Sequence, residues 1–263
     1  KRTTLAPLLW PGERGVPFTD DLAAATAQSV AAVWTSRLPR KTKDQIARHR
    51  PQMIEVEDGF IRSSGLGANC VPPLSIIADR RGIYFDPNKP SDLEHILQHA
   101  DIPAEIQAQA ESLRRAIIAA AISKYGNQGA AADVSAIKKQ AKGRKIILVH
   151  VLTSLTGFEA LLRQKPVTTH GVPFYAGWGL TEDFGHIPAR RSRRRNLDEL
   201  VAASLILYAR YLDPVTGLPC PADILIQRLH DDVPPPSSPL TRFRQLQGSI
   251  RLFLNKRVGS FAA

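Results

Sequence analysis

Apolar and polar positions alternate in short blocks along the first third of the chain. Residues 30–34 form a short β-prone run, and residues 53–58 alternate as a strand does before ending in two acids beside Gly59. The polar stretch 40–50 between them is expected to be helical. This order of strand, helix and strand predicts an α/β fold.

Two apolar runs follow, at residues 74–79 and 82–86, with Arg80 and Arg81 between them. This spacing predicts a tight hairpin. Because the strands of a hairpin are antiparallel, these residues would not fit a purely parallel sheet.

Capping residues mark several helix starts. Ser91 with Glu94, and Asn196 with Glu199, have the spacing of a capping box. The second box is expected to open a helix over residues 197–211. Further helices are expected from Pro103 to about Tyr125 and from Pro221 to Leu229.

A β-branched run at residues 145–149 continues without a break into residues 150–152, as one predicted strand. Thr153 or Ser154 can cap the helix that follows, since its apolar residues recur on one side. Residues 166–169 form the next predicted strand.

The formal net charge of +11 indicates an anionic partner but does not choose among nucleic acid, lipid, sugar nucleotide and acidic glycan. Residues 190–195 place five arginines in six positions. We interpret this run as a solvated turn, because no aromatic residues alternate with the arginines as nucleic-acid stacking would require. A loop that holds phosphate remains compatible with it.

Cys70 and Cys220 lie far apart, which argues against a disulfide framework or a zinc site and favours a reducing cytoplasm. No apolar run approaches the roughly 20 residues that span a bilayer. The only methionine is Met53, so a fragment or processed product is expected. His95 and His99 share a predicted helix face without a third ligand, so no metal site is expected.

A capped helix that follows directly from a strand points free amides at the end of the sheet, which suits a phosphate. Thr153, Ser154 and Gly157 are therefore candidate phosphate-binding residues, Gly157 because a missing Cβ lets a ligand approach. Glu159 is a candidate acceptor for the ribose hydroxyls of a nucleotide. An ordinary helix cap and a solvated helix acid are the alternatives.

Two further groups could contact a sugar. Glu57, Asp58 and Arg62 could hold hydroxyls and a carboxylate, or could form an internal ion pair that orders the turn. Tyr175 and Trp178 lie in a loop with glycines between large rings, which is either a sugar-stacking wall or a buried anchor.

Five segments of the chain carry a recognisable pattern: His150–Arg163, Lys165–Val167, Pro173–Thr181, Glu57–Ser63 and Pro72–Ser75. Together they resemble the capsule polysaccharide biosynthesis family of Gram-negative bacteria, of the KpsC/LipB type. The family consists of glycosyltransferases that add 3-deoxy-manno-octulosonic acid (Kdo) from CMP-Kdo. The form found here is most similar to the carboxy-terminal module of the full family protein.

The resemblance implies a GT-B-like fold of two Rossmann-like halves, with the second truncated. The expected parts are an acceptor-side half (1–125), a connection (126–143), a donor-side half with crossing helices (144–233), a Pro-rich linker (234–239) and a basic amphipathic helix (240–263). The last could lie on an anionic membrane surface or pack against the protein.

In the family, a strand like residues 146–149 leads to an acidic segment whose aspartate is thought to be the nucleophile of a retaining transfer, and a Lys-x-His-Pro type donor motif follows. Neither is present here, and on the order of two βαβ units of about 30 residues each have no counterpart. A retaining transfer needs that carboxylate, so turnover is expected to be impaired while binding could survive.

The resemblance therefore implies a role in capsular polysaccharide biosynthesis and export. The expected partners are CMP-Kdo as substrate with no other cofactor, a lipid-linked Kdo acceptor, an anionic membrane surface and other capsule-assembly proteins. The expected location is cytoplasmic and peripheral to the inner membrane. A nucleic-acid-binding module, which the arginine run does not favour, and a non-catalytic remnant or partner protein are the alternatives.

Overall fold

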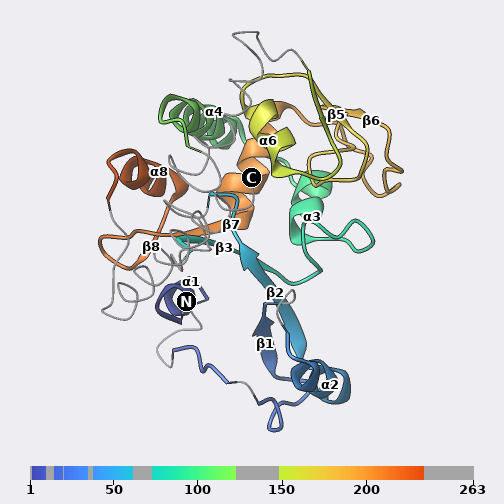
Figure 1. Cartoon of the computed structure of the whole chain (residues 1–263), viewed down its shortest axis with the longest axis vertical. Helices are drawn as coiled ribbons and strands as arrows, with labels where there is room; N and C mark the ends of the chain where they lie inside the picture. Colours follow the sequence, from blue (N-terminus) through green and yellow to red (C-terminus); the bar gives the residue numbers. More distant parts are fainter. Residues whose placement is uncertain are drawn as a thin grey trace, which may run out of the picture.

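The computed structural model of the chain describes residues 2–9, 15–19, 21–34, 38–61, 73–122 and 148–233. In these ranges the chain forms two sheets with helices packed against them (Figure 1). Strands β1 and β2 with helix α2 form one end of the long axis, and β5, β6 and helix α6 lie toward the other.

The larger sheet has the strand order β1-β2-β3-β7-β8. β1 and β2 are parallel, and the other neighbours are antiparallel. Because β3 pairs with β7, the carboxy-terminal half of the chain returns to the sheet that the amino-terminal half begins. The strands are β1 (Val30–Val33), β2 (Gln52–Asp58), β3 (Ser75–Asp79), β7 (Ala209–Leu212) and β8 (Pro219–Cys220).

The smaller sheet is parallel, with the order β4-β5-β6. Its strands are β4 (Val149–Val151), β5 (Val167–Thr169) and β6 (Glu182–Asp183), and helix α6 (Leu155–Leu162) connects the first two. Val149, Val151 and Val167 pack into the core on the side of α6. Parallel strands need such a crossover, which explains the strand, helix and strand order of this segment.

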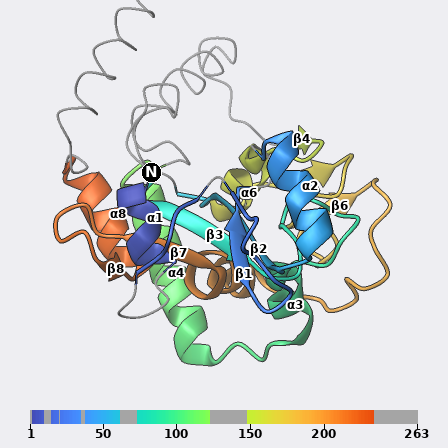
Figure 2. The ribbon, with the colours of Figure 1, turned by 90° about the horizontal axis from the view of Figure 1, so that it is seen from below.

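The remaining helices surround the larger sheet and the junction between the sheets. Figure 2 shows α1 lying against β7. Leu8 of α1 packs with Ile76 and Leu212 on one face of the larger sheet, whereas α8 belongs to the main core with Ile77 and Tyr211 on the other face. These helices are α1 (Arg2–Leu8), α2 (Arg40–His49), α3 (Asp92–His99), α4 (Ala104–Ala119), α7 (Leu197–Val201), the π-helix η3 (Ala202–Tyr208) and α8 (Ala222–His230).

A cluster of aromatic rings joins the two sheets. Phe60 follows β2, and its ring centre lies 4.8 Å from that of Phe174 and 5.9 Å from that of Phe158 in α6. Tyr84 and Tyr208 also contact Phe60. The end of β2 is thereby held beside α6, in one continuous hydrophobic core.

The predicted hairpin is wrong, although β3 is antiparallel to both of its neighbours as that prediction required. Residues 82–86 form turns rather than a strand. The buried carboxylate of Asp79 accepts the amides of Arg81 and Gly82, which bends the chain away at the end of β3. It also accepts the hydroxyl of Tyr208 at 2.6 Å.

The helix expected over residues 197–211 ends earlier. Its capping box of Asn196 and Glu199 is present, but the helix continues in π form and stops at Tyr208. Residues 209–212 then extend as β7, because β3 offers a partner for their backbone. Local periodicity could not reveal a partner strand so distant in the sequence.

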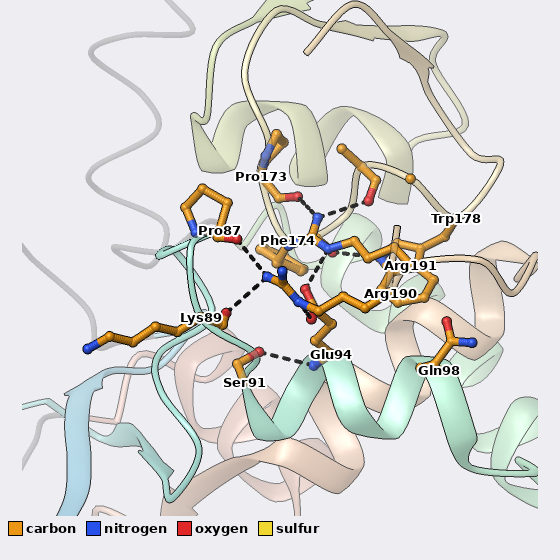
Figure 3. A network of polar contacts seen from close by, with 12 residues as sticks. Pro87, Lys89, Ser91, Glu94, Gln98, Pro173, Phe174, Trp178, Arg190 and Arg191 are labelled. Carbon is orange, nitrogen blue, oxygen red and sulfur yellow. Dashed lines mark hydrogen bonds and ion pairs between the residues drawn. The ribbon is translucent and has the colours of Figure 1, made fainter. Parts of the chain in front are cut away.

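The first capping box is only half formed. The Ser91 side chain accepts the amide of Glu94 at 3.0 Å, as expected for a helix cap. The Glu94 carboxylate does not complete the box, because it accepts hydrogen bonds from Arg190 and Arg191 in the loop after β6 (Figure 3). Arg190 additionally donates to the carbonyl of Pro87 at 2.6 Å.

Arg191 extends this network to the loop between β5 and β6. Arg191 as a whole residue is 7% exposed, and its guanidinium donates to the carbonyls of Pro173 at 2.7 Å and Ala176 at 3.0 Å (Figure 3). Burial lowers the pKa of Arg191, and the neighbouring Glu94 opposes that shift. Glu94 therefore supplies the counter-charge for a buried cation that also orders a loop.

The arginine run at 190–195 is thus not a solvated turn. Besides the contacts of Arg191, Arg195 is 5% exposed, pairs with Glu199 and donates to the carbonyls of Leu97 and Ala100. Those carbonyls lie at the end of α3, where a helix leaves them without intrahelical partners. Arg191 and Arg195 are structural and are not available to a nucleic acid, whereas Arg190 and Arg194 are exposed.

Several predicted features lie outside the described residues. They are Arg62, the connection 126–143, the linker 234–239 and the basic helix 240–263. In the ranges that are described, no helix has the length and apolar character needed to cross a bilayer. The predicted domain boundaries stay predictions.

Replacing Glu94 by Ala should destabilise the protein by roughly 3–5 kcal/mol, because it leaves the buried Arg191 without a counter-charge. Urea denaturation measures this change. Asp101→Ala is the matched control: it breaks an ion pair with Arg193 in which the Asp101 side chain is 93% exposed, and it should change stability little. Equal effects of the two substitutions would contradict the structural role of Glu94.

Candidate functional site

The amino-terminal end of α6 is open to solvent. Ser154 is its N-cap, in extended conformation, and the Ser154 side chain accepts the amide of Thr156 at 3.2 Å. Thr153 and Ser154 are both exposed. The predicted cap is therefore confirmed, and the start of the helix is accessible to an anion, which would compete with the Ser154 oxygens for the amides of Thr156 and Gly157.

The loops after β4, β5 and β6 lie side by side at the same edge of the sheet. A Cβ at Gly171 would lie 2.8 Å from the carbonyl oxygen of Leu152, and one at Gly185 would lie 2.5 Å from that of Gly171. Glycine permits these backbone approaches. The three loops consequently form one continuous shelf beside Thr153 and Ser154, at the carboxyl ends of parallel strands, where α/β proteins bind ligands.

The structure gives Gly157 a role different from the predicted one of letting a ligand approach the helix. A Cβ there would lie 2.2 Å from the hydroxyl oxygen of Tyr175, so the space is filled by this side chain and not left for a ligand. The Tyr175 hydroxyl donates to the carbonyl of Ser154 at 2.5 Å. Burial raises the pKa of Tyr175, which keeps the hydroxyl protonated as a donor. Gly157 supports the site through packing.

Tyr175 and Trp178 are buried and present no ring to a sugar. Both are 0% exposed, and the Trp178 indole donates to the carbonyl of Phe174 at 2.8 Å. The Arg191 guanidinium lies 5.8 Å from the centre of the Trp178 ring. The interpretation of this loop as a buried anchor is therefore confirmed, and its interpretation as a surface on which a sugar stacks is wrong.

The carboxylates predicted to contact hydroxyls lie on two elements. Glu159 is partly exposed in α6, one helical turn after the cap. Glu57 and Asp58 end β2 and are partly buried, with the Glu57 carboxylate accepting the amide of Asp58 at 2.9 Å. The ring of Phe60 then connects this turn to α6. Their roles in ligand binding stay predictions.

Sequence reasoning missed Asp183 at the end of β6. Its carboxylate accepts the hydroxyls of Thr169 at 2.8 Å and Thr181 at 2.6 Å, and the amide of Gly177 at 2.8 Å. Gly177 has a positive φ of 88°. Asp183 therefore ties the aromatic loop to the shelf. The sequence did not indicate this because β6, which contains Asp183, is only two residues long.

A metal centre finds no support in the ranges that the structure covers, because no group of three or more His, Cys, Asp or Glu side chains is placed to hold an ion. The arrangement of the shelf suits an anionic ligand held by amides and hydroxyls.

Comparisons with known proteins point to one family. The family model described as "Capsule polysaccharide biosynthesis protein" matches residues 30–146 and 115–211. The capsule polysaccharide modification protein LipA of Neisseria meningitidis serogroup A is 34% identical over an alignment of 245 residues that covers 64% of this chain and 35% of LipA. The lipopolysaccharide-processing protein LpsZ of Rhizobium meliloti is 30% identical over 259 residues, covering 68% of this chain and 58% of LpsZ. The chain thus spans about a third of LipA.

Two solved structures are similar in fold. The β-Kdo 2,4 transferase of Thermosulfurimonas dismutans KpsC has a TM-score of 0.63 and 28% identity, over 76% of this chain and 86% of that one. Its β-Kdo 2,7 transferase has a TM-score of 0.58 and 27% identity, over 78% and 85%. The predicted GT-B-like α/β fold is confirmed.

This chain contributes fewer residues to the alignment with LipA than LipA does. Because 64% of 263 residues is about 168, about 77 of the 245 positions aligned with LipA face no residue of this chain, a length of roughly two βαβ units. The aligned region is thus shorter here than in the relative.

Replacing Gly157 by Ala tests the packing of Tyr175. Alanine favours a helix by roughly 1 kcal/mol over glycine, but overpacking costs roughly 1–3 kcal/mol, so a net loss of stability is expected. In a Tyr175→Phe background the nearest clashing atom is gone, and Gly157→Ala should cost less. Thermal denaturation of the four proteins measures the coupling, and simple additivity would contradict the contact.

Proposed function

Because this chain belongs to the capsule polysaccharide biosynthesis family, we propose that it acts in capsule assembly as a derivative of a Kdo transferase module. It binds the nucleotide end of CMP-Kdo but lacks the part that performs transfer. The open cap of α6 at the carboxyl end of a parallel sheet is the observation that carries the binding half of this proposal.

The loss of transfer rests on the shortened region before β4. The family's expected nucleophile lies on a segment with no counterpart here, and the roughly 77 unmatched positions in the alignment with LipA support such a loss. The family model matches this chain in two pieces rather than one, which also supports an interruption. A retaining transfer through a covalent intermediate requires a positioned carboxylate.

In this proposal the phosphate of CMP-Kdo accepts hydrogen bonds from the Ser154 hydroxyl and the first-turn amides of α6, and Glu159 accepts from the ribose. Glu57, Asp58 and Arg62 contact the lipid-linked Kdo acceptor. The protein works at the cytoplasmic face of the inner membrane beside other capsule-assembly proteins, and no cofactor besides the sugar nucleotide is needed. The resemblance to the family supports these assignments.

The nucleic-acid alternative is weaker than the sequence alone suggested. Its main support was the arginine run at 190–195, and Arg191 and Arg195 are buried against carboxylates and backbone carbonyls. Moving Arg191 to a phosphate backbone would remove one of the two arginines that pair with the buried Glu94.

Purified protein should transfer no Kdo from CMP-Kdo to a Kdo-primed acceptor, because the expected nucleophile is missing. Chromatographic analysis of the acceptor measures this. The Thermosulfurimonas dismutans KpsC transferase, assayed in parallel, is the positive control for substrate quality. Clear turnover by this chain would overturn the proposed loss of activity.

Substitutions of the α6 cap test the binding half. Ser154→Ala should weaken CMP binding by roughly tenfold in calorimetry, because a hydrogen bond to a charged group is lost, and Glu159→Ala should also weaken it. Ser154→Asp is the sharper variant: aspartate caps helices well, so stability should be kept, while its charge repels phosphate. Unchanged CMP affinity in a stable Ser154→Asp protein would remove the phosphate assignment.

A further inference from the structure

Three rings lie on the face of the smaller sheet that α6 does not cover. Side chains alternate along a strand, so His150 points away from the face that Val149 and Val151 bury against the core. His170 and Phe184 directly follow β5 and β6 and share the parity of this face. We name these three residues, His150, His170 and Phe184, the ring row.

The two imidazoles of the ring row form a flat surface. His150 Nδ1 and His170 Nε2 are 3.3 Å apart, and the ring centres are 5.5 Å apart with 22° between the planes. The distance between the two nitrogens plus the two ring radii is close to the distance between the ring centres. The two rings therefore meet edge to edge. The Phe184 ring continues the row, 5.5 Å from His170 at 14°.

The ring row is exposed. Phe184 is 66% exposed, a fraction too large for a ring covered on both faces, and both histidines are exposed. Leu152 beside them is 68% exposed. Parallel sheets are ordinarily covered on both faces, so a row of exposed rings here is unusual and indicates a binding role.

The ring row adjoins the cap of α6. The His170 amide donates to the carbonyl of Val151 at 2.8 Å, and Gly171 contacts the backbone of Leu152 and the side chain of Thr153. Neighbouring strands are about 5 Å apart, so the row spans roughly 10 Å from β4 to β6. That distance is comparable to the length of a nucleoside monophosphate.

We propose that the ring row is the stacking platform for the base of the nucleotide whose phosphate binds at Ser154. The choice of a cytosine base rests on the proposed function, and the platform itself rests on the ring geometry. A base has a flat π-face that stacks on aromatic side chains, whereas the saturated ring of Kdo has none.

Phe184→Trp provides a direct reporter of stacking. Its fluorescence, taken as the difference from the native protein, should be quenched by cytidine and by CMP but not by ribose 5-phosphate. Cytidine carries no phosphate and ribose 5-phosphate carries no base, so the two probes separate the ring row from the α6 cap.

Calorimetry gives the second readout. His170→Ala and Phe184→Ala should each weaken CMP binding by roughly tenfold and leave ribose 5-phosphate binding unchanged. Phe184→Tyr keeps the ring and should retain CMP affinity. Leu218→Ala, which removes another exposed apolar side chain (58% exposed) in the turn between β7 and β8, is the matched control and should have no effect.

Each pattern of results decides between the two sites. If CMP and ribose 5-phosphate bind equally well and cytidine does not quench Phe184→Trp, the stacking platform is overturned while the phosphate site stands. If cytidine quenches but ribose 5-phosphate fails to bind, the platform stands and the phosphate assignment fails. If no probe binds or quenches, both are overturned.

Discussion

The geometry of the candidate site depends on the ion pair between the buried carboxylate of Glu94 and Arg191. The carboxylate neutralises Arg191, which is 97 residues away in sequence, and Arg191 in turn holds the carbonyls of Pro173 and Ala176. The loop fixed in this way carries Tyr175, whose hydroxyl holds the carbonyl of Ser154. A helix of the first half of the chain thereby positions the cap of a helix in the second. A buried pair of this kind is costly to break even where a hydrophobic replacement would be equally stable.

The sequence was sufficient where local rules decide the structure. The Asn196–Glu199 capping box, the Ser154 cap and the strand, helix and strand order around α6 are present as expected. Each depends on residues within one turn or one crossover of each other. The family resemblance, carried by long motifs, supplied the GT-B-like arrangement that local patterns do not specify.

Long-range contacts explain the predictions that were wrong. The Ser91–Glu94 spacing is that of a capping box, yet Glu94 turns to two arginines from the other half of the chain. The same contacts bury Arg191 within an arginine run that the sequence pattern predicted to be solvated. Tyr175 and Trp178 are large rings between glycines, and composition alone cannot distinguish a ring that binds sugar from one that fills a core. Burial depends on packing partners that are distant in the sequence.

A chain with a shortened donor-side region would keep the carboxyl edge of its small sheet, because two contacts order the loop beside that edge. The Asp183 carboxylate accepts the amide of Gly177, and Arg191 donates to the carbonyl of Pro173. The central claim is that this edge still binds a nucleotide. Titrating the isotope-labelled protein with CMP and following its amide NMR signals tests this most directly. The account predicts shifts concentrated at Thr156, Gly157 and the loops 170–171 and 184–185, and an absence of shifts there, or shifts confined to residues 190–195, would contradict it.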